Sequence, residues 1–227
     1  MAKIVWDQVG ERFYETGIDH GVLYPQDQSG VYSTGVAWNG LTSVSESPSG
    51  AEPTDLYADN IKYLSIRSAE TFGATVEAYT YPDEFAVLDG SAQLTDGVII
   101  GQQTRKAFGL CYRTRVGNDI QFEDYGYKLH LIYGCSVSPS EKSYQTINDS
   151  PEAITFSWEM TTVPVNVTGF KPTATLIIDS KTVGAAKMTD IEDVLYGTDE
   201  NQPRLPLPDE VLSIILGTDT DTDTDTE

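Results

Sequence analysis

The chain has 227 residues, long enough to bury a substantial core, and its 39% hydrophobic and 22% charged residues are typical of a globular protein. Fourteen basic residues against 35 acidic ones give a formal net charge of −21, which argues against binding to nucleic acid or anionic lipid as the default function. No apolar run is long enough to predict a membrane span. We expect no secretory signal, because Asp7 interrupts the N-terminal region before an apolar stretch develops.

Alternation of apolar and polar residues is the dominant pattern, and it predicts a mainly β protein with half-buried strands. In chain order, the predicted strands are 35–44, 61–67, 71–78, 108–116, 127–137, 154–160 and 173–178. Asn39-Gly40 is the strongest hairpin signal, because this pair accepts the positive φ values of a type I′ turn. Turns are also predicted at 58–60 and 117–119, between strand candidates.

Helices are predicted to be few and short. One is expected at Pro82–Leu88, where a proline with acidic neighbours starts a helix and Gly90 ends it. Thr189 to Glu192 forms a capping-box pattern that predicts the start of a second helix, closed by Gly197. A third is expected to begin at Pro208, and its apolar residues must dock on the body or on a partner.

The long segment Ser43–Asp55 is polar and holds two prolines, so it predicts an irregular excursion rather than a tight turn. Residues 1–217 are predicted to form a single domain, with this loop at 43–55 and a C-terminal helical segment at 187–217. An acidic low-complexity tail follows at 218–227. The last ten residues carry five acids, so most of the negative charge belongs to the rest of the chain.

The sequence predicts no catalytic, metal-binding or cofactor-binding residue, and we expect no enzyme. Only two histidines are present: His20 is expected in a turn and His130 in a strand. Alternation places Cys111 on the sheet face of Arg113 and Arg115, and Cys135 on the opposite face, with Leu129, Leu131, Tyr133 and Val137. The two thiols are therefore not expected to bridge, and two unpaired thiols favour synthesis in a reducing compartment. The odd spacing of His130 and Cys135 also predicts opposite faces, which argues against a Cys-His pair.

Other candidate chemistry has a simpler interpretation. Asp219 to Asp223 imitates the start of a calcium loop but lacks the required glycine and the final glutamate. Glu159 stands beside Trp158 and could be an acid in an aromatic cleft, but a solvent-facing strand residue is the preferred interpretation. Arg113 and Arg115 project from one strand face, and we expect them to pair with acids, preferably across a subunit interface.

The order of several segments resembles the major tail protein of long, non-contractile-tailed bacteriophages (siphophages), the subunit of the tail tube. The segments that carry the resemblance are 35–46, 55–64, 70–85, 126–134 and 154–158, and the likeness continues into the C-terminal helices. It therefore covers most of the chain. The Thr-Asp tail at 218–227 is not part of it.

The resemblance implies a β-sandwich or barrel-like tail-tube fold and a structural virion protein with no cofactor. It implies hexameric rings that stack into a tube around a tape-measure protein, bounded by tail-tip and tail-terminator proteins. The loop at 43–55 would reach between stacked rings, and the helix at 82–88 would flank the tube. The subunit would be made and assembled in the bacterial host cytoplasm and end in the virion tail, with viral DNA passing through without specific binding and no membrane bound by this chain.

Two alternatives remain open at the level of sequence. One is a β-sandwich virion module for recognition or decoration, which would bind a cell-surface glycan or another virion protein through surface tryptophan and tyrosine. The other is a hydrolase with two carboxylates in a cleft, a pattern that 35 acids could hide.

Overall fold

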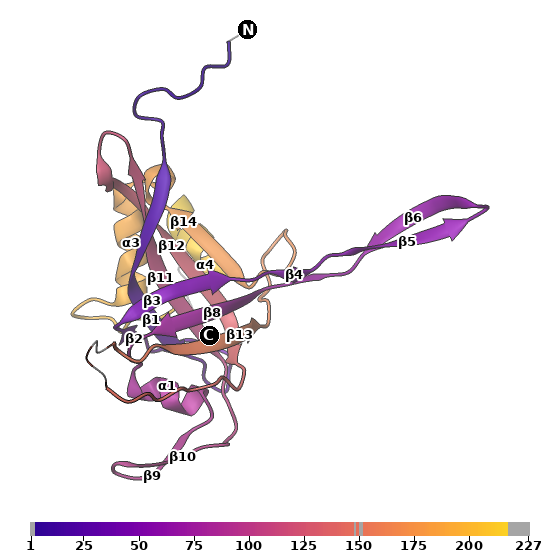
Figure 1. The fold of residues 1–227 in the computed structure, drawn as a ribbon. Coiled ribbons are helices and arrows are strands. Elements are labelled where there is room, and N and C mark those ends of the chain that lie inside the picture. The colour runs from indigo at the N-terminus through magenta and orange to yellow at the C-terminus, as the bar shows by residue number, and fades with distance from the viewer. Residues whose placement is uncertain (1–2, 148, 150–151, 218–227) are drawn as a thin grey trace, which may run out of the picture.

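The computed structural model describes residues 3–147, 149 and 152–217, and it is mainly β with a few short helices (Figure 1). The predicted fold class is confirmed: a large antiparallel sheet forms the body and folds over in the manner of a β-sandwich. The acidic tail at 218–227, with its calcium-like sequence, lies outside the described residues.

The main sheet has eight strands in the order β2-β1-β11-β12-β13-β8-β3, and β14 also pairs with β12. These strands are β1 (Tyr14–Pro25), β2 (Val36–Trp38), β3 (Leu41–Glu46), β8 (Gly73–Ala78), β11 (Phe108–Asn118), β12 (Phe122–Val137), β13 (Phe156–Thr162) and β14 (Thr175–Asp179). Six further strands pair outside it: β4 (Ser49–Gly50) with β7 (Glu70–Thr71), β5 (Pro53–Ala58) with β6 (Ile61–Arg67), and β9 (Ala92–Thr95) with β10 (Val98–Ile100). The helices are α1 (Asp83–Leu88), α2 (Ser180–Val183), α3 (Ala185–Tyr196) and α4 (Pro208–Leu216).

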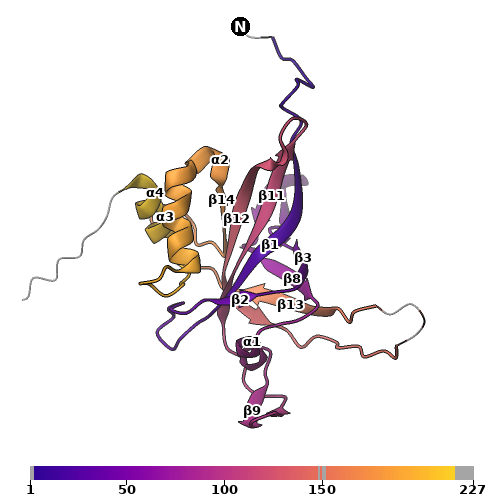
Figure 2. The same ribbon diagram turned by 90° about the vertical axis from the view of Figure 1, so that its left-hand side faces the viewer.

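Strand β12 is long because it pairs with strands in both halves of the main sheet: β11 and β14 in the first half, and β13 in the second, which also contains β8 and β3. Its residues 128–132 pair with β14, whereas 135–137 pair with β13. Between these parts Gly134 has a φ of +60°, and the register with β11 shifts at this point. The bulge redirects the end of β12, so the strands β13, β8 and β3 cross the first half of the sheet instead of extending it (Figure 2).

The turn at Asn39-Gly40 brings the two ends of the main sheet together. It connects β2, which pairs with β1, to β3, which pairs with β8 at the far end of the strand order. The predicted hairpin is therefore wrong: Gly40 has a positive φ but Asn39 does not, and no ladder joins β2 to β3 in the described chain. The turn at residues 39–40 directs β2 and β3 to different partners, because the sheet curls back on itself at this point.

Two hydrophobic cores lie on the two faces of the sheet. The first is rich in aromatic rings, with Trp38, Phe85 and Trp158 fully buried and their ring centroids 4.5–5.7 Å apart. Helix α1 contributes Phe85 and Leu88, so it closes one end of the space enclosed by the folded sheet. The predicted helix at Pro82–Leu88 is confirmed, with Pro82 as its N-cap residue.

The second core lies between the sheet and the C-terminal helices (Figure 2). Tyrosines from the sheet side bury their rings and donate their hydroxyl groups to helix-side carbonyls: Tyr24 to Leu195 at 2.7 Å and Tyr133 to Pro206 at 3.0 Å. This core therefore holds the helices by polar contacts of defined geometry as well as by apolar burial. The helix predicted from Pro208 is confirmed, with Gly217 as a left-handed C-cap.

Two local predictions need correction. The capping box at Thr189 does not start a helix: α3 begins at Ala185, and the Thr189 hydroxyl donates to the Ala185 carbonyl one turn earlier. His20 is not in a connecting turn but in β1, at a bulge where its φ is +51°. The alternation in this strand is broken by register shifts near Gly17 and His20, so the sequence pattern gave no signal for β1.

We predict that Gly134→Ala destabilises the protein by about 3 kcal/mol or more. A Cβ at this position would lie 2.2 Å from the Val163 carbonyl oxygen, and the φ of +60° disfavours any side chain. Urea unfolding followed by tryptophan fluorescence measures the change.

The matched control is Gly169→Ala. Gly169 also has a positive φ, of +80°, but nothing lies within 4 Å of the added Cβ. This variant isolates backbone strain, which costs about 1–2 kcal/mol. Equal losses in the two variants would contradict a role for Gly134 as the corner of β12.

Candidate assembly interface

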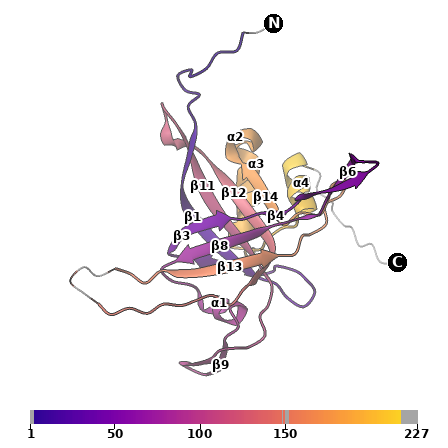
Figure 3. The ribbon, with the colours of Figure 1, turned by 45° about the vertical axis from the view of Figure 1, so that its right-hand side comes forward.

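A long two-stranded arm projects from the body between β3 and β8 (Figures 1 and 3). We call residues 47–72, which include β4 to β7, the β-arm. At about 3.4 Å per residue, its outgoing strand from Ser47 to Ala58 can extend roughly 40 Å. The predicted irregular loop at 43–55 is therefore wrong in form and in length, because this segment is the end of β3 and the first half of a β-hairpin.

The tip of the β-arm follows from turn chemistry. Asp59 and Asn60 have φ values of +51° and +63°, as a type I′ turn requires, so the predicted turn at 58–60 is confirmed. The polar face of the arm carries Asp55, which pairs with Lys62 at 2.7 Å and accepts a hydrogen bond from Ser65 at 2.8 Å. These contacts agree with the register of the hairpin, in which Asp55 lies opposite Ser65.

The opposite face of the β-arm is apolar and has no partner in the described chain. Leu56 faces Leu64 across the hairpin and Thr54 faces Ile66, and all six residues of β5 and all seven of β6 are exposed. A hairpin that packs against nothing is only marginally stable in water. This exposed apolar face is therefore a candidate contact surface.

Two strands of the main sheet, β1 and β14, present open edges. The first part of β1, Tyr14 to Asp19, pairs with β11 on one side, whereas β2 covers only residues 21–23 on the other. Strand β14 pairs with β12 alone among the described strands. Open edges of this kind are templates for pairing with another chain.

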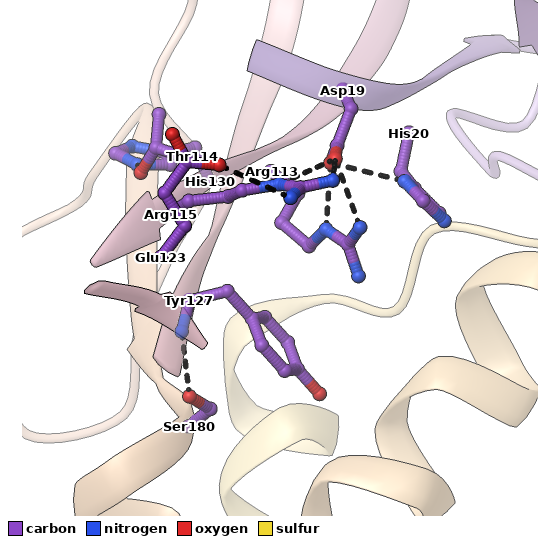
Figure 4. Close-up of polar contacts among 9 residues, drawn as sticks. All are labelled: Asp19, His20, Arg113, Thr114, Arg115, Glu123, Tyr127, His130 and Ser180. Atoms are coloured by element: carbon purple, nitrogen blue, oxygen red, sulfur yellow. Dashed lines mark hydrogen bonds and ion pairs between the residues drawn. The ribbon is translucent and has the colours of Figure 1, made fainter. Parts of the chain in front are cut away.

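Arg113 and Arg115, expected at a subunit interface, pair within the protomer instead (Figure 4). Arg113 donates to both oxygens of Asp19, at 2.6 and 2.9 Å, and Arg115 donates to the same carboxylate at 3.2 Å. The Arg113 guanidinium also lies 5.1 Å from the Tyr127 ring centroid. The preference for an interface was wrong because β1, which supplies Asp19, was not predicted.

The two thiols lie on opposite faces of the sheet, as predicted, but Cys135 lies on the face opposite to Leu129 and Leu131. The bulge at Gly134 reverses the alternation, so those leucines share the helix-side core with Cys111. Both cysteines are fully buried and free, and burial raises the pKa of the Cys111 thiol to about 12. Neither is therefore a nucleophile of the usual kind.

The same bulge corrects the prediction for His130, which lies on the Cys135 side of the sheet. Its ring stacks on Tyr112, a member of the core that contains Cys135, with centroids 4.6 Å apart. The Cys135 thiol points instead toward the Ile132 carbonyl at 3.9 Å. Glu159 is exposed, as the preferred interpretation held, and Trp158 beside it is buried.

The tryptophans do not form a binding platform in the described chain. Trp38 and Trp158 are in the core, whereas Trp6 lies exposed in the N-terminal segment before β1. Half of the exposed large apolar residues of the described chain occur in three projecting segments: the β-arm, the N-terminal segment and the β9–β10 hairpin.

Within the described residues, no group of three or more histidine, cysteine or acidic side chains is arranged to hold a metal ion. Nor does any helix there have the length and apolar character needed to cross a membrane. Comparisons with protein-family models and with curated proteins find no match to this chain.

The Asp19 contacts generate a prediction about acid stability. Hydrogen bonds from Arg113, and then from Arg115, hold the pKa of Asp19 well below its ordinary value. Because the folded state depresses this pKa, the stabilisation is present above about pH 4 and is lost as the pH falls further. We expect Asp19→Asn to lower the free energy of unfolding at pH 7 by about 2 kcal/mol and to flatten its decline between about pH 4 and pH 2.

Asp55→Asn is the control, because Asp55 is paired with Lys62 on the exposed β-arm. Surface pairs of this kind contribute little. Chemical denaturation at a series of pH values measures both variants. An acid profile of Asp19→Asn that matches the unsubstituted protein would refute the assignment.

Proposed function

We propose that this protein is a structural virion protein, the subunit of a siphophage tail tube that polymerises as stacked, hexameric rings. The observation that carries the proposal is the β-arm, whose apolar face has no partner in the described protomer. Such a face is expected to be covered by a second copy, because a marginal hairpin gains its stability from packing. The resemblance of the chain to major tail proteins gives the same answer from sequence.

Support for ring closure comes from the topology of the first half of the sheet. The strands β1, β11, β12 and β14 alternate in direction, so the two open edges run antiparallel to each other. In a ring whose subunits share one orientation, β14 of one copy can therefore continue into β1 of the next as an antiparallel pair. The edges that would be a liability in a monomer become the ring contact.

The β-arm would then join successive rings. It extends roughly 40 Å, beyond what contact within a protomer requires, and its polar face stays solvated through Asp55, Ser65 and Lys62. Its apolar face, with Leu56, Leu64 and Ile66, would pack on a subunit of the adjacent ring. The arm is thus the stacking element and the sheet edges are the ring element.

The charge of −21 fits a passive conduit. A channel wall rich in acid and poor in base would not retain DNA, because contacts that release counterions need lysine or arginine. The tube would enclose a tape-measure protein and meet tail-tip and tail-terminator proteins, and viral DNA would pass through it without specific binding. A tube structure with a basic channel wall would overturn this part of the proposal.

Electron microscopy of the purified protein at low and high salt tests assembly, because salt screens the repulsion between acidic subunits. We expect rings or hollow tubes, longer or more numerous at high salt. Leu64→Lys should leave rings but block stacking, since it places a charge on the apolar face of the β-arm.

Ser65→Lys is the matched control for the stacking test, because it adds the same side chain one residue away on the polar face, next to Asp55. It should still form tubes. Long tubes from Leu64→Lys would contradict the role of the arm. Dispersed particles under all conditions, together with glycan binding, would favour a recognition module instead.

The sheet edge gives a separate test. The Tyr133 N–H donates to the Ala174 carbonyl, and the antiparallel pattern then directs the N–H of Ile177 away from β12 and toward the open edge. Ile177→Pro removes this donor and should prevent ring closure while the protomer stays folded. Ile177→Val keeps the N–H and should assemble normally. Closed rings from the proline variant would exclude β14 from the ring contact.

A further inference from the structure

A buried histidine lies where the β-arm meets the body. His130, on β12, is only 7% exposed, and its ring is almost parallel to that of Tyr112 on β11, with an angle of 6° between them. On the same side lies Glu46, the last residue of β3 before the β-arm begins. Residues from three strands therefore meet at the root of the arm.

The Glu46 carboxylate is shared between the two stacked rings. The Tyr112 hydroxyl donates to Glu46 Oε1 at 2.7 Å, and His130 Nδ1 lies 3.5 Å from the same oxygen. This distance is too long for a good hydrogen bond, and Nδ1 is buried without a hydrogen-bond partner in the described structure. A protonated His130 ring would be stabilised by the neighbouring Glu46 carboxylate. A neutral ring makes only a weak contact with it.

The other ring nitrogen can accept either protonation state. His130 Nε2 lies 2.9 Å from the Thr114 hydroxyl, which can donate to a bare nitrogen or rotate to accept from a protonated one (Figure 4). When the ring is protonated, both of its nitrogens donate: Nδ1 faces the Glu46 carboxylate and Nε2 faces the Thr114 hydroxyl oxygen. Both groups can accept a hydrogen bond. The added charge would act on Glu46, because that carboxylate is the nearest group of opposite sign.

We propose that His130 and Glu46 form a latch, operated by the binding of one proton, that fastens the root of the β-arm to the sheet. In the neutral state the Glu46 side chain is held by the Tyr112 hydroxyl, and the backbone at the arm root is held by its pairing with β8. In the protonated state His130 and Glu46 form an ion pair, which draws the end of β3 toward β12 and restricts the arm. The latch belongs to a single protomer, and only its consequence for ring stacking rests on the proposed function.

The surrounding groups determine how the latch responds to pH. Glu46 from β3 and Glu15 from β1 favour the protonated ring, Lys128 from β12 opposes it, and Tyr112 from β11 covers one ring face. Desolvation is the largest influence and holds the pKa of His130 below its ordinary value. Because the folded state lowers this pKa, protonation weakens global stability as the pH falls below about 6.5, while it tightens the local contact at the arm root.

Nuclear magnetic resonance on dispersed protein tests the latch. The chain has only two histidines, so the ring signals of His130 can be assigned with a His20→Gln variant. We expect His130 to titrate, and the protection factor of the Ser47 amide to rise with the same midpoint. Ser47 N–H donates to the Gly73 carbonyl at 2.8 Å, so this amide reports opening at the base of the arm.

Glu46→Gln should lower the pKa of His130 and abolish the coupling to Ser47. Tyr112→Phe keeps the stacked ring and should leave the coupling in place. Glu77→Gln is the matched control, because Glu77 is a carboxylate on β8 that accepts from Ser43 at 2.9 Å, in the same half of the sheet.

Three results would overturn the latch: a His130 that stays neutral down to acid unfolding, a titration without a change in Ser47 protection, or an equal effect of Glu77→Gln. Each would leave the tail-tube proposal standing, because that proposal depends on assembly seen by microscopy. Loss of assembly together with an intact latch would contradict the tail-tube proposal and leave the latch standing.

Discussion

The bend of β12 at Gly134 is the constraint on which the rest of the fold depends. This 16-residue strand pairs with β14 through residues 128–132 and with β13 through 135–137, and at the corner between them a Cβ on Gly134 would collide with the Val163 backbone. The bend sends β13, β8 and β3 across the first half of the sheet. It therefore encloses the aromatic core and aims the β-arm, which is the continuation of β3 and β8, away from the body.

The same bend explains why sequence predicted the architecture better than the details. Unbroken alternation predicted the strands containing Trp158 and Leu110, and the Asp59-Asn60 turn was readable from its chemistry. Alternation assumes that faces never exchange, so it failed for Cys135 beyond the bulge and missed β1, whose bulges break the pattern near His20. The capping box at Thr189 misled because α3 gains its position from the core below it, not from its cap.

The candidate site was harder to predict than the fold for two reasons. It includes a surface that no other part of the described chain covers, and it depends on contacts between residues far apart in sequence. The apolar and polar faces of the β-arm could be told apart only after the register of Leu56 opposite Leu64 was known. Glu46 and Tyr112 are 66 positions apart and meet through the curl of the sheet. Arg113 pairs with Asp19 on β1, the strand that alternation did not predict. The contact expected at a subunit interface is therefore internal.

These features have a common logic in the balance between folding and assembly. The protomer satisfies its charged clusters internally, through Asp19 with Arg113 and Arg115, and buries its two thiols. Within the described residues it leaves two antiparallel sheet edges and one apolar face of the β-arm uncovered, and in the proposed assembly a second copy would cover them. In the proposed assembly like-charged copies would repel, so the contacts that join them would have to be backbone pairing and apolar packing, which are insensitive to the sign of the surface charge. Such a protomer would form an ordered assembly only where its open sheet edges and the apolar face of the β-arm meet a second copy. Its negative charge would oppose every other contact between copies.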